Sequence, residues 1–208
     1  MFPSWISRFG AACGVVLGLS IGVPGLIEAF TGETALTSLV IGLGAAFGAP
    51  ALTAFYLHQS ESAGRFGAVA YAVNLIGLCL FSGVAFALNL VIFFLDAPVV
   101  AGLLAGPTRF ALLTGVAVFA VGTVLFGISM VRARVFPRPA AWIYMLSLVA
   151  LTALAQLPDT PLTSAVHVVA CGVLVWMSAS VWSAGAAGTA GAVRSGVPGA
   201  GGLRAGRP

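Results

Sequence analysis

Residues 9–30 read FGAACGVVLGLSIGVPGLIEAF and contain a single charged side chain, Glu28. A helix needs about 20 predominantly apolar residues to cross the hydrocarbon core of a bilayer, and this segment is long enough. The whole chain has the same character, because 60% of its 208 residues are hydrophobic and only 7% are charged. Soluble globular domains carry roughly 25% charged residues. The composition therefore excludes a cytosolic enzyme and a nucleic-acid-binding protein, and it predicts a polytopic protein whose first partner is the lipid bilayer.

Five further segments are apolar and long enough to be membrane spans. The six predicted spans are 9–30, 35–57, 67–95, 110–131, 140–157 and 163–182. The apolar segment 97–107 is shorter and holds two prolines and two glycines, so we expect an interfacial or re-entrant loop there. Segment 184–208 is rich in Gly, Ala and Arg, which is typical of a flexible tail. We predict an all-α fold: a bundle of six transmembrane helices over 1–183, followed by this tail.

The arginines indicate how such a bundle is oriented. With six spans, the side that carries both termini receives Arg8, Arg65, Arg132, Arg134, Arg138, Arg194, Arg204 and Arg207. The opposite side receives only Arg109. Because cytoplasmic loops carry the excess of basic residues, we predict a cell-membrane protein with its N- and C-termini in the cytoplasm. An odd number of spans would destroy this asymmetry.

The first span carries a ladder of small residues. Gly10, Gly14, Gly18 and Gly22 recur every four positions and so lie along one side of a helix. Helices in lipid associate by close packing, and small residues mark the faces where backbones meet. We therefore expect a neighbouring helix to pack tightly along this ladder, and a kink beyond it at Pro24.

Several polar side chains fall at one depth of the predicted bundle, in the half away from the termini. They are Glu28, Asn89, Gln156 and His167, and Asp96 caps the same side. Each has a purely structural interpretation. Glu28 can lie in water at the interface, Asn89 and Gln156 can pair between helices, and His167 can be a satisfied core histidine. No second histidine or cysteine is placed to complete a metal site with His167 and Cys171, and no cofactor motif occurs.

The alternative is that these side chains converge on one cavity. A carboxyl that is partly desolvated between helices can stay protonated and act as a general acid. By position we take Glu28 as the first candidate for this acid and Asp96 as the second. Aromatic rings stabilise cations. The supporting and cavity-lining candidates are Asn89, Gln156, His167, Phe93 and Trp176. This chemistry suits protonation of an alkene or epoxide in a hydrophobic small molecule that enters from the bilayer.

Segment 122–142, GTVLFGISMVRARVFPRPAAW, joins the fourth and fifth predicted spans. Its LFG-x-x-x-x-RARV-x-PR pattern resembles small uncharacterised six-helix membrane proteins of high-GC bacteria. In size, topology and aromatic content the chain also resembles the small membrane-bound terpene cyclases of bacterial meroterpenoid pathways. This second resemblance implies a membrane enzyme that cyclises an isoprenoid chain by protonation, without a metal or cofactor. The glycine ladder and the lack of a catalytic motif favour the other interpretation, a non-catalytic transporter or assembly subunit for a small hydrophobic or cationic solute.

Overall fold

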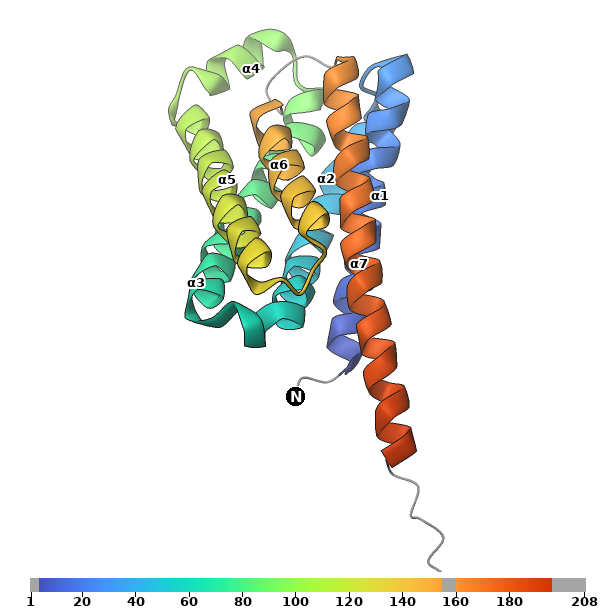
Figure 1. Cartoon of the computed structure of the whole chain (residues 1–208). Coiled ribbons are helices and arrows are strands. Elements are labelled where there is room, and N and C mark those ends of the chain that lie inside the picture. The colour runs from blue at the N-terminus through green and yellow to red at the C-terminus, as the bar shows by residue number, and fades with distance from the viewer. Residues whose placement is uncertain (1–3, 155–159, 196–208) are drawn as a thin grey trace, which may run out of the picture.

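A computed structural model describes residues 4–154 and 160–195, and over these ranges the chain is helical without a strand (Figure 1). This confirms the all-α fold class. The elements are α1 (Ser4–Thr31), α2 (Ala35–Gly44), η1 (Ala45–Phe47), α3 (Gly48–Leu90), η2 (Ile92–Phe94), α4 (Ala97–Leu104), α5 (Pro107–Ala133), α6 (Arg138–Leu154) and α7 (Pro161–Ser195). The elements η1 and η2 are short 3-10 helices. Helix α7 continues to Ser195, past residue 183, where we placed the start of the tail.

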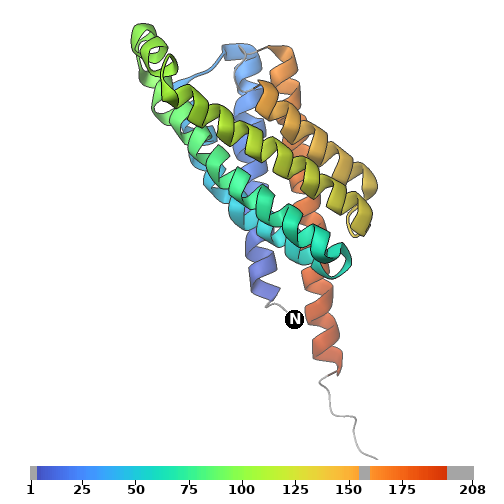
Figure 2. The same cartoon turned by 90° about the vertical axis from the view of Figure 1, so that its left-hand side faces the viewer.

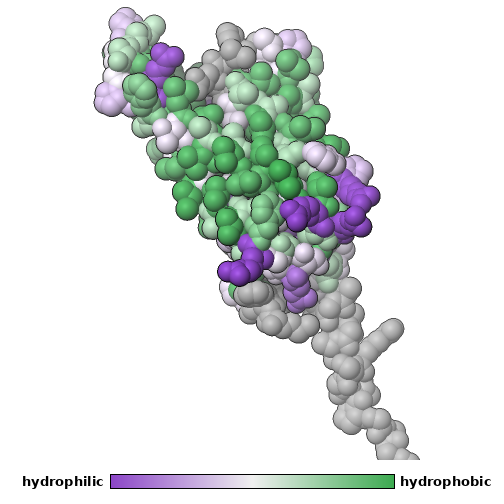
Figure 3. Space-filling view, turned by 60° about the vertical axis from the view of Figure 1, so that its left-hand side comes forward, coloured by the Kyte–Doolittle hydropathy of each residue, from purple (hydrophilic) through white to green (hydrophobic). Residues whose placement is uncertain are grey.

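Four helical stretches of the described chain are long and apolar enough to cross a membrane. They are Trp5–Thr31, Ala35–Phe94, Pro107–Ala133 and Pro161–Gly185. Helix α6 is apolar but shorter. Figure 3 shows a broad apolar belt on one face of the molecule, with hydrophilic side chains gathered at its two ends. Side chains such as Ile76, Val121 and Leu146 are more than half exposed on the surface, which is the surface that contact with lipid requires.

The long stretch Ala35–Phe94 is a helical hairpin. Gly64 has φ +58° and ψ −158°, a conformation that glycine adopts readily and that breaks α3 into two halves. The halves run antiparallel, because Ser82 Oγ donates to the Ala45 carbonyl at 3.3 Å and the rings of Tyr56 and Tyr71 stack 4.3 Å apart. Figures 1 and 2 show the chain reversing here. The stretch therefore has two legs: α2, η1 and the first half of α3, then the second half of α3.

The second half of α3 ends at Leu90, five residues before the predicted end of the third span. Val91 leaves the helical conformation, and η2 follows. The next segment, which we predicted as a loop, forms α4 and crosses one end of the bundle (Figure 1). Asp96 stands at its N-cap and Pro98 in its first turn, which are favourable residues for starting a helix. We call this end of the bundle the α4 end and the opposite end the Gly64 end.

Glycines bring the helices into contact. A Cβ atom at Gly18 would lie 3.2 Å from the Cys171 carbonyl oxygen of α7, and one at Gly22 would lie 2.9 Å from Cys171 Sγ. This confirms that a neighbouring helix packs against the ladder on α1, and at Gly18 and Gly22 that helix is α7. At Gly10 it is α3, because a Cβ there would lie 2.6 Å from the Pro50 carbonyl oxygen. Helix α1 continues through Pro24 up to Thr31. On the other side of the bundle, a Cβ at Gly122 of α5 would lie 2.5 Å from the Asn74 Cα of α3. Side chains at these positions would separate the helices that form the pockets.

Candidate functional site

A pocket of about 340 Å³ lies near the α4 end, between α1, α2, the second half of α3, η2, α6 and α7. Its volume is at the lower end of the range for small-molecule sites, about 300–1,000 Å³. Most of its lining is apolar, and its polar side chains are Glu28, Glu33, Asn89, Thr163 and His167. We call it the polar pocket. These polar side chains come from α1, the turn that follows it, α3 and α7, so only the fold could assemble them.

The structure brings together four of the side chains singled out in the sequence. Glu28, Asn89, Phe93 and His167 all line the polar pocket. Phe93 reaches it from η2, because the chain leaves the α3 helix after Leu90 and turns once over the pocket. The shared depth of Glu28, Asn89 and His167 along their helices was the signal that predicted this convergence, and Phe93 was selected as an aromatic candidate for the same cavity.

Three other predicted site residues do not line this pocket. Asp96 is exposed at the N-cap of α4, so its carboxyl faces solvent at the end of the bundle. Trp176 is 45% exposed on the outer face of α7. Trp176 follows His167 by nine residues on α7. At about 100° per residue, this separation puts the two side chains on opposite faces of the helix. Gln156 lies outside the described residues.

Glu28 is the buried acid of the polar pocket. Its side chain is only 7% exposed although it lies within one turn of the end of α1. The α1 helix closes with a hydrogen bond from the Gly32 amide to the Glu28 carbonyl at 3.0 Å. Gly32 then has φ +69°, which reverses the chain toward α2. The turn at Gly32 thus leads the chain directly from the helix that carries Glu28 into α2, which lines the same pocket.

Glu33 is a pocket residue that the sequence analysis did not select. It directly precedes Thr34, the N-cap of α2, whose side chain and that of Thr37 form a reciprocal capping box. The Glu33 carboxylate is exposed on one side and accepts a hydrogen bond of 2.6 Å from the buried Ser38 hydroxyl. The motif Gly-Glu-Thr-x-x-Thr at residues 32–37 was the available signal, since a glycine before a capping box predicts a tight turn, and Glu33 lies in that turn.

His167 is held in place from two sides. Its Nδ1 lies 2.7 Å from the Thr163 carbonyl oxygen. A carbonyl only accepts hydrogen bonds, so Nδ1 is the donor, and in the neutral tautomer with this bond Nε2 is the acceptor. On the other side the ring packs against Gly25 of α1, where a Cβ atom would overlap the His167 Cβ and lie 2.7 Å from its Cγ. The imidazole can therefore occupy this position only because residue 25 has no side chain.

Asn89 contributes an amide to the polar pocket. Its Nδ2 donates to the Ala85 carbonyl of the preceding turn at 2.8 Å, which fixes the side chain along α3. One N–H remains for another partner, together with the acceptor Oδ1. Helix α2 approaches closely here, because a Cβ at Gly42 would lie 3.2 Å from the Asn89 Cβ. Asn89 is thus a hydrogen-bonding group that is held on α3 and packed against α2.

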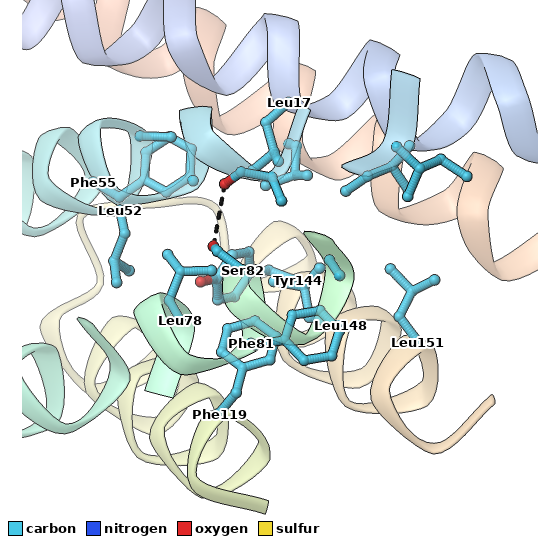
Figure 4. Close-up of a pocket in the computed structure, with 17 residues that line it drawn as sticks. Leu17, Leu52, Phe55, Leu78, Phe81, Ser82, Phe119, Tyr144, Leu148 and Leu151 are labelled. Carbon is cyan, nitrogen blue, oxygen red and sulfur yellow. Dashed lines mark hydrogen bonds between the residues drawn. The ribbon is translucent and has the colours of Figure 1, made fainter. Parts of the chain in front are cut away.

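A second pocket, of about 90 Å³, adjoins the first one, because the two have lining residues in common. Figure 4 shows the side chains that line it. Its aromatic lining consists of Phe55, Phe81, Phe119 and Tyr144, and most of the remaining lining is aliphatic. We call it the apolar pocket. Both pockets share five lining residues, namely Ile21, Ile41, Phe81, Ala85 and Leu151. The shared wall means that a ligand in the polar pocket sits directly above an aromatic, apolar chamber.

Within residues 4–154 and 160–195, no three His, Cys, Asp or Glu side chains are grouped so that they could hold a metal ion. The polar pocket therefore offers organic acid, base and amide groups. Comparisons with protein-family models, curated proteins and solved structures find no match for this chain. Its function has to be inferred from the chemistry and geometry of its own pockets.

Proposed function

We propose that the chain crosses the bilayer six times, with both termini in the cytoplasm. The six passes are α1, the two legs of the Ala35–Phe94 hairpin, α5, α6 and α7. The antiparallel hairpin about Gly64 supports this count, because it turns one long apolar stretch into two passes. The excess of arginine on the side of the termini supports the orientation.

Within this membrane domain we propose an enzyme that acts on a hydrophobic isoprenoid-type substrate by protonation-driven cyclisation. The observation that carries this proposal is the combination of two carboxyl groups, Glu28 and Glu33, in a polar pocket that adjoins an aromatic chamber. The two acids have different environments, since Glu28 is buried and Glu33 is exposed and bonded to Ser38. Two carboxyls in different environments can divide the roles of acid and base.

In the proposed reaction Glu28, in its protonated form, gives its proton to the epoxide oxygen or terminal alkene of the substrate. With an epoxide, one C–O bond breaks and the oxygen becomes a hydroxyl. The electron pair of a neighbouring alkene forms a new C–C bond to the electron-deficient carbon, and the positive charge moves along the chain. The last cation loses a proton to the Glu33 carboxylate or to His167 Nε2. The product is an isomer of the substrate. Glu33 or His167 then releases its proton to solvent, and solvent protonates Glu28 again.

The remaining groups of the two pockets fit the needs of this reaction. Asn89 offers an amide that can orient the oxygen to be protonated, and Phe93 lies beside it. Phe81 and Phe119 stack with ring centroids 4.7 Å apart on the wall of the apolar pocket. Each aromatic face stabilises a nearby cation by about 0.5–2 kcal/mol. Largely apolar walls also restrict water, which would otherwise capture the cation.

The test is product formation by membranes that contain the protein. The probe is an aryl compound with a terminally epoxidised farnesyl chain, and the expected product has the same mass but fewer alkene signals. Glu28→Gln keeps the shape of the side chain and removes the acid, so we expect a loss of about 10²–10⁴-fold, the usual contribution of a general acid. The matched control is Glu61→Gln, which replaces an exposed carboxyl at the Gly64 end of the bundle and should retain activity. Wild-type rates in Glu28→Gln would end the proposal.

A non-catalytic carrier is the second candidate function. The acidic character of the polar pocket favours it, because the charged side chains that line this pocket in the described chain are Glu28 and Glu33. Such a lining suits a hydrophobic cation. Protein in liposomes that moves a cationic amphiphile such as farnesylamine, without converting the epoxide probe, would identify the carrier instead of the enzyme.

A further inference from the structure

We propose that the apolar pocket is a binding site for the hydrocarbon end of the ligand, and that its closed floor limits the length of chain that the protein accepts. The polar end of the same molecule then lies in the polar pocket, beside Glu28 and His167. The identity of the ligand as an isoprenoid rests on the proposed function. The existence of a length-limited chain site does not require that the chain be converted.

The shared wall defines the path between the pockets. Ile21 of α1, Phe81 and Ala85 of α3 and Leu151 of α6 line both of them. These side chains are apolar, and Ala85 is small. A chain that leaves the polar pocket therefore passes between hydrocarbon side chains and never meets a charged group.

The apolar pocket offers few polar groups to a ligand, since its polar side chains in the described chain are Ser82 and Tyr144. Ser82 Oγ donates to the Ala45 carbonyl, as the dashed line in Figure 4 shows. Tyr144 is the other polar side chain, and its ring makes edge contacts with Phe55 and Phe126. A polar ligand group in this chamber would lose its water and meet mostly hydrocarbon, which is costly. The chamber is therefore suited to an alkyl or alkenyl chain.

The floor of the chamber is a rigid part of the core. Leu52 and Phe55 are 2% and 1% exposed, and Tyr144 is 3% exposed. The Phe55 ring makes edge contacts with Phe136 and Tyr144 at centroid distances of 6.0 and 6.4 Å. Closely packed interiors yield little to added volume. A hydrocarbon chain that is too long for the chamber would have to displace this cluster. The polar end of such a ligand would therefore not reach its position beside Glu28.

Two adjacent alanines in η1 provide a matched pair of variants. Ala45 lines the apolar pocket, whereas Ala46 is exposed on the outside of the bundle. A phenylalanine at position 45 would occupy part of the chamber, and the same residue at position 46 would face outward. A third variant, Leu148→Ala, removes volume from a lining residue that is 7% exposed and should lengthen the chamber.

The experiment uses the full chain in nanodiscs and three amines, geranylamine, farnesylamine and geranylgeranylamine, each with a diazirine on the last isoprene unit. After irradiation, mass spectrometry locates the labelled peptide. In the wild type we expect farnesylamine to label the segments 45–55 and 144–148. Ala45→Phe should reduce this labelling roughly tenfold while geranylamine still labels the protein, and Ala46→Phe should behave as the wild type. Leu148→Ala should shift the preference toward geranylgeranylamine.

The inference is overturned if the diazirine labels only lipid-facing side chains, or if Ala45→Phe and Ala46→Phe give the same chain-length profile. Failure of the proposed function has a different signature. Labelling of the apolar pocket without conversion of the epoxide probe would retain the chain site and refute the cyclase. Conversion without labelling of the pocket would retain the cyclase and refute the chain site.

Discussion

Replacing Gly25 with alanine tests whether close packing of α1 on α7 holds the polar pocket together. The added methyl group would overlap the His167 Cβ and lie 2.7 Å from its Cγ. Carbon atoms in good contact are about 3.5–4.0 Å apart. The Cβ of His167 is fixed to the α7 backbone, and Nδ1 is bonded to the Thr163 carbonyl. A rotation of the ring cannot relieve the overlap, so α7 itself has to move.

The magnitude follows from two opposing terms. Overpacking of a tight contact destabilises by about 1–3 kcal/mol. Alanine is a better helix former than glycine by about 1 kcal/mol. We therefore expect Gly25→Ala to lower the free energy of unfolding by up to about 2 kcal/mol, and to be about 1–3 kcal/mol less stable than a Gly→Ala variant in a helix without the clash. For a chain of this size, 1 kcal/mol corresponds to a change in Tm of roughly 2–4 °C.

The control is Gly172→Ala, because a Cβ at Gly172 of α7 meets no atom within 4 Å. This variant gains helix propensity without a clash and should be as stable as the wild type or more stable. The assay is thermal unfolding of the purified proteins in one detergent, followed by tryptophan fluorescence. Combining Gly25→Ala with His167→Gly removes the overlapping Cβ and should recover more of the lost stability than Gly25→Ala combined with His167→Gln. Equal or higher stability of Gly25→Ala relative to Gly172→Ala would refute the packing argument.

The other predictions concern the α3–α5 contact and the topology. Gly122→Ala should destabilise the protein by about 1–3 kcal/mol, because the new Cβ would lie 2.5 Å from the Asn74 Cα, and an unchanged Tm would contradict this. The topology is tested in a variant without the native cysteines. A cysteine at position 62, which is exposed near Gly64, should react with an impermeant maleimide only from the cytoplasmic side, and so should a cysteine added at the N-terminus. Gly102→Cys in α4 should react only from the opposite side, and reaction of all three from one side would disprove six passes.

Periodicity and composition predicted much of the helix content, because apolar segments of this length have few alternatives to a helix in lipid. The bounds were less accurate where local backbone chemistry decides them. The third span ends at Leu90 and not at residue 95, since Val91 leaves the helix, and 97–104 is helical. Both differences concern where a helix ends or begins within an apolar stretch. Hydropathy is the same on either side of such a boundary, so the pattern of apolar residues could not predict it.

The site was predictable only in depth along each helix. Glu28, Asn89 and His167 lie at one level, and rise per residue is enough to establish that. Whether side chains at one level face each other depends on the rotation of each helix about its axis. This rotation placed Trp176 on the outer surface and left Asp96 in solvent. Glu33 entered the site because the turn at Gly32 directs it there.

Residue composition and local spacing were enough to predict that this chain is helical and apolar enough for a membrane. The glycines of α1 also marked the face that another helix could approach, because a glycine leaves room for a neighbouring backbone. The packed fold was needed to learn that α7 and α3 occupy that room, that Gly64 folds one long apolar stretch into two legs, and that the polar pocket lies against an aromatic chamber. Those features depend on contacts between residues far apart in the chain, and such contacts form only when the helices have fixed their mutual positions.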